Sequence, residues 1–440
     1  MAAQDQGDAS RVLILGGGLT GIGTALHLGR RPWMMLERED RLGGHARTDE
    51  TRGFFFDKTG HWLHLRDAGI KALVESVLPG QLVSVERKAR VFSHGVLTRY
   101  PFQGNLHGLP PAVNSECLLG FLDAQMNPSS EAPRNFEEYC LQKFGVGISK
   151  HFMVPYNEKL WGVHPREITS AWCSRFVPVP KLPDVVRGAV GDVPPEIGYN
   201  VSFLYPKQGG IETLVRGLVS RLDASRIHTR SQPERICVRD HAVELGGERL
   251  RYGALVASAP LPELVKLLDD APREVVDAAD KLRCTAVRYL NVATRRPAKA
   301  AYHWLYVPER QYPFYRVGVY TNAVPSMAPP GCGSLYVELS ERGPMPSLDA
   351  ILPGIAEALV AAQVLDAPDD ILFAELKEIR WAYVVFDEHY YDAVGTITRY
   401  LESVDIYPRG RYGSWTYNSM EDCLIAGRQV AEHLLQPATK

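Results

Sequence analysis

A G-x-G-x-x-G spacing near the start of this 440-residue chain constrains its fold more than any other feature. The three glycines are Gly16, Gly18 and Gly21. They follow a short apolar run, residues 12–15, that predicts a buried parallel strand, and residues 22–28 can continue as a helix. A second apolar run ends at Glu37, where a carboxylate can accept hydrogen bonds from an adenosine ribose. Because the glycines permit a tight turn and close approach of a pyrophosphate, the stretch predicts a βαβ unit that binds a dinucleotide.

A second glycine pair indicates which dinucleotide this is. The sequence RLGGHART, residues 41–48, resembles the pattern R-x-G-G-R-x-x-[ST] that follows the second strand in flavoproteins of the amine-oxidase and protoporphyrinogen-oxidase kind. The glycine pair lets the backbone lie against a diphosphate, and Arg41 or Arg47 can offset its charge. His45 stands where the pattern has arginine. We therefore predict FAD, the alternative being that the pair forms only a surface turn.

Three later stretches complete the expected cofactor site. A glycine turn at residues 209–210 precedes an amphipathic helix, residues 211–222. Residues 234–258 alternate in polarity and resemble the returning strands of an FAD domain, and a glycine–arginine block follows at residues 410–422. The residues expected to bind the cofactor are Gly16, Gly18, Gly21, Glu37, Arg38, Gly43, Gly44, Thr48, His61, Val238, Gly410 and Met420.

Composition is that of an ordinary globular protein, with 45% hydrophobic and 23% charged residues. The formal net charge of −2 gives no sign of a nucleic-acid partner. No apolar run is long enough for a membrane span, and the polar residues 1–10 do not resemble a signal peptide. We therefore expect a cytoplasmic protein without a membrane span, and whether it forms an oligomer stays open.

The cysteine pattern gives no sign of a metal site. Seven cysteines lie far apart, at positions 117, 140, 173, 237, 284, 332 and 423, and no C-x-x-C pair occurs. Neither a zinc site nor a disulfide framework is indicated, so we expect free thiols in a reducing compartment.

These patterns predict an α/β fold in which a Rossmann-like FAD-binding domain, discontinuous in sequence, carries a mixed α+β substrate domain. The cofactor fold begins at the N-terminus, resumes near residues 205–260 and closes at the C-terminus. The expected segments are 1–100 (FAD-binding), 101–200 (mostly helical, substrate side), 201–280 (FAD-binding), 281–385 (antiparallel sheet and helix of the substrate domain) and 386–440 (FAD-binding closure).

Four stretches further resemble the UDP-galactopyranose mutases, which share one FAD-dependent family with amine oxidases and protoporphyrinogen oxidases. HWLH at residues 61–64 is similar to the mutase H-x-F-H segment beside the flavin ring. YNEKLWG at residues 156–162 resembles Y-T-x-K-Q-W-G, whose tryptophan stacks on the nucleotide base. YRV at residues 315–317 resembles T-R-I, whose arginine contacts the diphosphate. GRYGSWTY at residues 410–417 is similar to G-R-L-G-x-Y-x-Y, with an arginine near flavin and sugar and a tyrosine near the diphosphate.

The resemblance implies a redox-neutral mutase that interconverts the pyranose and furanose forms of an NDP-sugar, through attack of reduced flavin N5 on the anomeric carbon. It implies FAD in the reduced form, a nucleotide-sugar as substrate and an external reductant for the flavin. The residues implied in catalysis are His61, His64 and Arg411. The residues implied in substrate binding are Tyr156, Trp161, Arg175, Arg316, Tyr383, Arg411 and Tyr417.

Two positions depart from the mutase pattern. Mutases carry two arginines in R-x-P-x-R after the tryptophan motif, whereas residues 175–180 read RFVPVP and hold only the first. The aspartate of the mutase ending Y-x-D-M-D falls on Ser419. Because both positions touch substrate in the mutases, the nucleotide or the sugar can differ from UDP-galactose here.

Other interpretations stay open at this stage. The histidine pair can be structural, Trp161 can be a packing residue, and Arg316 can belong to a partly exposed ion pair. The rival function is an FAD-dependent amine oxidase or protoporphyrinogen oxidase-like oxidoreductase. Such a site favours an aromatic, uncharged pocket rather than an arginine opposite the flavin. A non-catalytic, FAD-stabilised subunit is the third hypothesis.

Overall fold

A five-stranded parallel sheet forms the centre of the cofactor half of the molecule. The computed structural model describes residues 10–173, 177, 179–192, 202–299, 301–340 and 342–436. The strand order is β19-β13-β1-β2-β9, and every pairing in the sheet is parallel. The strands are β1 (Val12–Leu15), β2 (Trp33–Leu36), β9 (Ile227–His228), β13 (Ala254–Ala257) and β19 (Ile406–Pro408). The sheet thus draws on the start, middle and end of the chain, which confirms the predicted discontinuous Rossmann-like fold.

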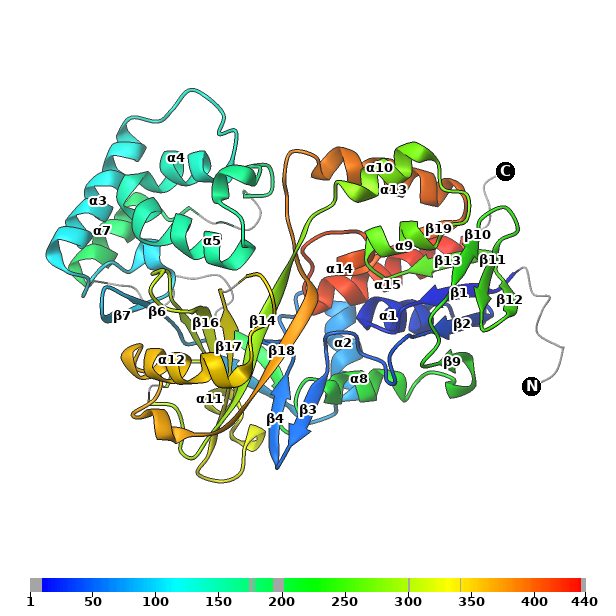
Figure 1. Cartoon of the computed structure of the whole chain (residues 1–440), viewed down its shortest axis with the longest axis horizontal. Helices are drawn as coiled ribbons and strands as arrows, with labels where there is room; N and C mark the ends of the chain where they lie inside the picture. The colour runs from blue at the N-terminus through cyan, green and yellow to red at the C-terminus, as the bar shows by residue number, and fades with distance from the viewer. Residues whose placement is uncertain are drawn as a thin grey trace.

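Helix α1 (Leu19–His27) packs closely against helix α15 (Met420–Leu435) beside this sheet (Figure 1). A Cβ atom at Gly427 would lie only 2.5 Å from the carbonyl oxygen of Thr20, so the two helix backbones touch. The C-terminal segment is therefore held against the first glycine turn. The remaining helices of this half are α2 (Ala68–Val77), α8 (Glu212–Val219), α9 (Leu261–Leu267), α10 (Arg273–Asp280), α13 (Tyr390–Ser403) and α14 (Gly410–Gly413).

Short strands extend this half at its edges. A three-stranded antiparallel sheet is made of β10 (Arg235–Cys237), β11 (Ala242–Leu245) and β12 (Glu248–Arg251). Two further pairs are β3 (Thr48–Thr51) with β4 (Phe54–Asp57), and β5 (Leu82–Glu86) with β8 (Ser202–Pro206).

The other half of the molecule contains a seven-stranded sheet of order β18-β14-β17-β16-β15-β6-β7. Its strands are β6 (Ala89–Ser93), β7 (Val96–Arg99), β14 (Cys284–Thr294), β15 (Trp304–Tyr306), β16 (Phe314–Val319), β17 (Gly333–Leu339) and β18 (Ile371–Val384). All pairings are antiparallel except that of β6 with β15. The hairpin β6–β7, placed with the FAD-binding part by the predicted boundary at residue 100, instead extends this sheet because β6 pairs with β15.

The two faces of the large sheet differ in chemistry because side chains alternate along each strand. One face is aliphatic, with Leu305, Val317 and Val337 in one cluster with Leu359 of helix α12 (Leu348–Ala361). The opposite face carries aromatic and charged side chains, and part of it shares a core with the cofactor half. Its residues are Tyr289, Trp304, Tyr306, Arg316, Tyr336 and Glu338. The short helix α11 (Tyr320–Ala323) follows β16.

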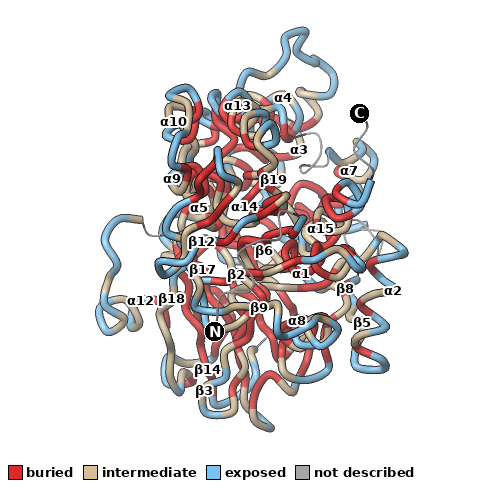
Figure 2. Tube along the Cα trace, turned by 90° about the vertical axis from the view of Figure 1, so that its right-hand side faces the viewer, coloured by how far each residue is buried: buried red, intermediate tan, exposed pale blue. Residues whose placement is uncertain are grey.

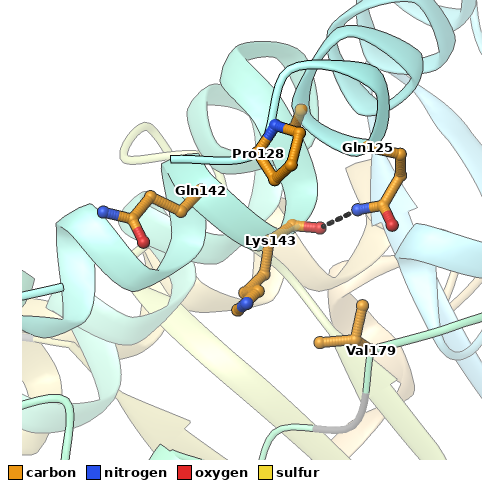
Figure 3. A pocket seen from close by; sticks show the side chains of 6 residues that line it. Gln125, Pro128, Gln142, Lys143 and Val179 are labelled. Atoms are coloured by element: carbon orange, nitrogen blue, oxygen red, sulfur yellow. Dashed lines mark hydrogen bonds between the residues drawn. The ribbon is translucent and has the colours of Figure 1, made fainter. Parts of the chain in front are cut away.

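Within the described residues, a group of helices lies above the sheet (Figure 1). They are α3 (Pro111–Met126), α4 (Phe136–Ile148), α5 (Val154–Trp161) and α7 (Leu182–Val190). Helix α5 has Pro155 in its first turn, where proline is tolerated. A pocket of about 250 Å³ lies between the ends of α3 and α4, where Gln125 donates to the carbonyl oxygen of Lys143 at 3.3 Å (Figure 3). None of the predicted site residues that the structure describes lines that pocket.

Buried segments run through the middle of the molecule and exposed segments lie at its periphery (Figure 2). Within the part of the chain that the structure describes, no helix is long and apolar enough to cross a membrane. The same residues contain no group of three or more histidine, cysteine, aspartate and glutamate side chains placed to hold a metal ion.

Candidate functional site

The first glycine turn joins β1 to α1 in a geometry suited to a pyrophosphate. Gly16 has a φ of +101°, a conformation that favours glycine. A Cβ atom at Gly21 would lie 2.1 Å from the carbonyl oxygen of Gly16, so α1 can start against the turn only because this residue is glycine. A Cβ atom at Gly18 would meet nothing closer than 3.9 Å, which leaves open space at the start of α1. Helix starts of this kind bind anions through backbone N–H groups and the helix dipole.

Glu37 is buried at the end of β2 and is oriented by two backbone amides. Its Oε2 accepts from Gly17 N at 2.7 Å, and its Oε1 accepts from Glu39 N at 2.8 Å. Each carboxylate oxygen retains a second lone pair for a ribose hydroxyl.

The second glycine pair lies directly against the first turn. Gly43 N donates to the carbonyl oxygen of Gly17 at 2.8 Å, and Gly43 forms a parallel bridge with Gly18. Gly43 and Gly44 both have positive φ, +118° and +59°, and a Cβ atom at Gly44 would lie 3.2 Å from Gly18 Cα. The two turns are therefore in backbone contact, and a diphosphate could lie along both.

The two arginines flanking the second pair are engaged within the protein. Arg41 forms ion pairs with Asp49 at 2.7 Å and with Glu212 at 3.3 Å. Arg47 is buried and donates to the carbonyl oxygens of Leu42 and Arg41. Arg47 therefore braces the turn.

Thr48 connects this region to the helix after the glycine turn at residues 209–210. Its hydroxyl donates to Asp57 Oδ1 at 2.7 Å and accepts from Glu212 N at 3.1 Å, and its amide donates to Glu212 Oε2 at 3.0 Å. Asp57 is fully buried, and burial raises its pKa to about 7. Thr48 thus fixes the start of α8 against the β3–β4 hairpin.

Two predicted cofactor residues have other contacts. The Arg38 side chain is 56% exposed and forms an ion pair with Glu39 at 3.3 Å. The amide of Val238 donates to Asp269 Oδ1 at 3.1 Å. The segment that contacts Glu37 is the one after β9 rather than the one that carries Val238, because Ser231 N donates to the Glu37 carbonyl oxygen at 2.8 Å.

The C-terminal block approaches the first glycine turn from the other side. Gly410 has a φ of +80°, and a Cβ atom there would lie 2.1 Å from Thr20 Oγ1 of α1. Met420 is the first residue of α15, whose preceding residue Ser419 caps the helix by accepting from Asp422 N. The glycine cradles, the oriented Glu37 and the C-terminal closure together fit FAD, which Gly18, Glu37, Gly43 and Gly44 would hold.

Two histidines near this cradle are neutral at neutral pH. Burial lowers the pKa of His61 from 6.5 to about 4, and the nearby Arg411 and Lys58 lower it further. Burial also lowers the pKa of His45 to about 3, with Lys58 adding to the effect. His61 Nδ1 lies 3.4 Å from the Thr59 carbonyl oxygen, so Nδ1 carries the proton and Nε2 is left as an acceptor. His61 can therefore accept or relay a hydrogen bond but does not act as an imidazolium.

His64 lies apart from His61 in its contacts. Its Nδ1 is 3.2 Å from the Ser202 carbonyl oxygen, and its ring packs edge-on against Phe203. Burial lowers its pKa to about 4, and Arg87 lowers it further. The structure thus places His61 with Arg411 and His64 with Arg87.

Arg411 is held among aromatic rings. Its guanidinium donates to the carbonyl oxygens of Asn418 and Ala382 at 2.8 and 2.9 Å. Its central carbon lies 4.5 Å from the Tyr417 ring and 5.8 Å from the Tyr383 ring, which stack on one another at 6.3 Å and 12°. The structure therefore brings together three residues predicted to bind substrate.

Arg316 forms a buried ion pair with Glu338, a residue that the sequence analysis did not single out. Its Nη2 is 2.6 Å from Glu338 Oε2 and donates to the Tyr383 hydroxyl at 2.7 Å. The Glu338 side chain is 1% exposed and that of Arg316 is 19% exposed. A single charged residue in an otherwise uncharged, strand-like run, GSLYVEL in β17, was the available signal for Glu338.

Tyr156 and Trp161, both on α5, face different neighbours. Tyr156 meets Tyr306 and Tyr315 edge-on at 5.5 and 6.2 Å between ring centroids. Trp161 meets Tyr383 edge-on at 5.7 Å, and a pocket of about 300 Å³ lies beside it. Helix α5 thus contacts the aromatic face of the seven-stranded sheet through Tyr156 and contacts Tyr383, whose ring lies beside Arg411, through Trp161.

Arg87 is a further guanidinium among aromatic rings, at a position that the sequence did not single out, directly after the last residue of β5. Its central carbon lies 4.9 Å from each of the Tyr100 and Trp304 rings, and it donates to the Tyr306 hydroxyl at 3.1 Å. The predicted substrate residue Arg175 lies outside the described residues.

Comparison with known proteins agrees with this geometry. The flavin containing amine oxidoreductase family matches residues 19–435, so the chain belongs to that family of flavoproteins. Reduced UDP-galactopyranose mutase is 25% identical, with 98% of this chain and 96% of that chain covered and a TM-score of 0.91. A protein assigned as a protoporphyrinogen oxidase, from Exiguobacterium sp. 255-15, is 17% identical over 97% and 99% of the two chains, with a TM-score of 0.76. Putrescine oxidase bound to putrescine is 13% identical over 97% and 98%, with a TM-score of 0.66.

Proposed function

We propose that this chain is an FAD-dependent mutase that interconverts the pyranose and furanose forms of a nucleoside-diphosphate sugar. The observation that carries the proposal is the joining of Arg316 and Arg411 through Tyr383, with neutral His61 nearby. The overall likeness to UDP-galactopyranose mutase supports it.

The arginines suit the charge that such a reaction develops. Reduced FAD would supply the nucleophile for the anomeric carbon, and the nucleoside diphosphate would leave with its charge increased. Arg316 and the hydroxyl of Tyr383 can bind that diphosphate, because a guanidinium offers paired donors to phosphate oxygens. Arg411, fixed by two carbonyl oxygens and three tyrosine rings, can hold the sugar end without reorganising.

Glu338 orients Arg316 in this arrangement. It compensates the charge of Arg316 and fixes the guanidinium, since both carboxylate oxygens lie within 2.7 Å of Nη2. The remaining donors of Arg316 include Nε, which is buried and has no hydrogen-bond partner among the described residues. A phosphate oxygen would supply that missing acceptor.

The aromatic side chains would receive the nucleoside. Tyr156 and Trp161 lie on one helix, Tyr156 in contact with Tyr315 beside Arg316 and Trp161 in contact with Tyr383, and rings of this kind are those on which a base stacks. His61, kept neutral by burial, can accept a hydrogen bond through Nε2 beside Arg411.

An amine oxidase-type activity is the second candidate, favoured by the parallel pair of Tyr383 and Tyr417 rings. Such a pair can hold a cationic amine by cation–π attraction. Here, however, the Arg411 guanidinium already lies 4.5 Å from the Tyr417 ring and would repel an amine cation. The local charge therefore favours an anionic substrate.

Product analysis of the reduced protein separates the two candidates. Dithionite-reduced protein is incubated anaerobically with UDP-galactopyranose, and with hexoses carrying other nucleoside diphosphates, and the sugars are separated by chromatography. The mutase proposal expects a furanose product only when the flavin is reduced. No conversion of any nucleotide sugar by the reduced protein would replace it with the oxidase if, in a separate sample of oxidised protein, amines reduce the flavin rapidly and give peroxide in the presence of oxygen.

A further inference from the structure

Lys159 of α5 is a buried lysine whose ammonium group is surrounded by backbone oxygens. Its residue is 7% exposed. The carbonyl oxygens within hydrogen-bond distance of Nζ are those of Val307 (3.0 Å), Glu309 (2.9 Å), Tyr312 (3.1 Å) and Phe314 (2.5 Å).

All four oxygens come from one short segment, residues 307–314, which joins β15 to β16. An ammonium has three N–H donors, so this cradle satisfies it completely. Burying a charge without such partners would be strongly unfavourable. The cradle resembles the carbonyl cages that replace the hydration shell of a monovalent cation. The segment is therefore folded around the amino group of Lys159, whose pKa burial lowers to about 7 and whose protonated form the carbonyl oxygens stabilise.

The cradle connects two groups that the proposed function assigns to substrate. Tyr156 lies three residues before Lys159, on the same face of α5, and its ring packs on Tyr306 and Tyr315 at the ends of the cradle segment. Arg316 follows the last cradle residue, Phe314, by two positions. The ammonium thus fixes the spacing between the helix that carries Tyr156 and the strand that carries Arg316.

Other contacts of α5 do not duplicate this role. Arg342 donates to the carbonyl oxygens of Lys159 and Leu160 at 2.7 and 3.2 Å and so caps the end of the helix, but it comes from the segment after β17. The ion pair of Glu158 with Arg310 does reach the cradle segment, but the Arg310 side chain is 72% exposed. Exposed ion pairs contribute little.

We propose that Lys159 is a positioning residue for substrate: through the four carbonyl oxygens of residues 307–314, it holds Tyr156 at the correct distance from Arg316 for both to contact one nucleoside diphosphate. The inference rests on the proposed function, because it assumes that these two residues share a ligand.

The test compares two variants in the full-length holoprotein. Lys159→Met removes the charge at nearly constant length. Lys150→Met is the matched control, since Lys150 is 60% exposed and pairs with Glu116 of α3. The measurements are FAD content, far-UV circular dichroism, the dissociation constant of UDP from flavin fluorescence, and KM and kcat for the nucleotide sugar.

We expect Lys159→Met to keep its FAD and its circular dichroism but to weaken UDP binding about ten- to hundredfold, because displacements of about 1 Å in positioning groups have effects of that size. KM should rise more than kcat falls. Lys150→Met should behave as wild type. Unchanged UDP affinity in a folded Lys159→Met protein would overturn the inference alone, whereas a wild-type protein that binds no nucleoside diphosphate would overturn the proposed function and with it this inference.

Chemical rescue gives a second readout that a purely structural lysine would not share. Lys159→Ala retains Cβ, so propylammonium matches the atoms removed, and propanol is its neutral counterpart. We expect propylammonium, and not propanol, to restore UDP affinity at constant FAD content. Loss of FAD and of folded structure in step with UDP affinity in both variants would show a structural role instead.

Discussion

The guanidinium of Arg316 and the carboxylate of Glu338, directly opposite each other on β16 and β17, form an ion pair with a nitrogen–oxygen distance of 2.6 Å. The two side chains are asymmetric in their burial, since that of Glu338 is 1% exposed and that of Arg316 is 19% exposed. Arg316 also donates to the Tyr383 hydroxyl, whereas Glu338 depends on Arg316 for its charge compensation. Loss of Arg316 should therefore cost more than loss of Glu338.

The first prediction follows from this asymmetry. Arg316→Met leaves a buried, uncompensated carboxylate and should lower the free energy of unfolding by about 3–5 kcal/mol. Glu338→Gln keeps an acceptor for the guanidinium and should cost only about 1–2 kcal/mol. The double variant should be more stable than Arg316→Met alone, and urea unfolding of all four proteins measures this. If the loss of unfolding free energy in the double variant equals the sum of the losses in the two single variants, the ion pair does not explain them.

The second prediction concerns the Tyr383 hydroxyl, which accepts from Arg316 at 2.7 Å. Tyr383→Phe removes one donor to the substrate and one constraint on the guanidinium. Because a hydrogen bond contributes about 0.5–1.5 kcal/mol net, affinity for UDP should fall about two- to tenfold while FAD content stays constant. Tyr391→Phe, at a residue 50% exposed on α13, is the control and should leave UDP binding unchanged. Equal affinities for UDP in Tyr383→Phe and wild type would remove Tyr383 from the substrate site.

The third prediction uses two glycines with the same backbone conformation. Gly44 and Gly29 both have a φ of +59°, but a Cβ atom at Gly44 would lie 3.2 Å from Gly18 Cα and one at Gly29 would meet nothing within 4 Å. Substitution by alanine should cost each protein about 1 kcal/mol of stability through the left-handed backbone. Only Gly44→Ala should also lose FAD, because it separates the two glycine turns. Absorbance of the purified proteins at the flavin maximum measures this, and equal FAD content would be the contrary result.

The cofactor fold was accessible from sequence because its signals are local. The glycine spacing, Glu37 and the second glycine pair lie within 33 residues, from Gly16 to Thr48, and each reflects a backbone requirement that few other residues meet. The sheet built from β1, β2, β9, β13 and β19 confirms that part.

The charge partners could not be found in that way, because they depend on pairing between distant strands. Glu338 meets Arg316 only through the register of β16 with β17, and Arg87 meets Trp304 across more than two hundred residues. The four oxygens around Lys159 are backbone atoms, which leave no side-chain signal at all. The place of the hairpin β6–β7 in the seven-stranded sheet could not be predicted for the same reason, since a parallel pairing with β15 is not visible in either segment alone.

The last prediction concerns the pH dependence that His61 gives to stability. Burial lowers its pKa from 6.5 to about 4, so between these pH values the unfolded chain binds more protons than the folded protein. The contribution of His61 is therefore complete above pH 6.5 and is lost as the pH falls toward 4, by about 3 kcal/mol if the shift is fully expressed. Asp57 acts in the opposite direction, because burial raises its pKa to about 7, so the pH dependence of wild type alone does not isolate the histidine.

Subtracting the free energy of unfolding of His61→Gln from that of wild type removes the contributions of Asp57 and of the other groups that both proteins share. The stability of wild type relative to this variant should increase as the pH rises from 4 to 6.5 and stay constant above. Urea unfolding at several pH values, with FAD content followed in parallel, measures the difference. If the His61→Gln curve is instead parallel to that of wild type, the imidazole is not held neutral by burial, and His61 could then carry a proton in the reaction.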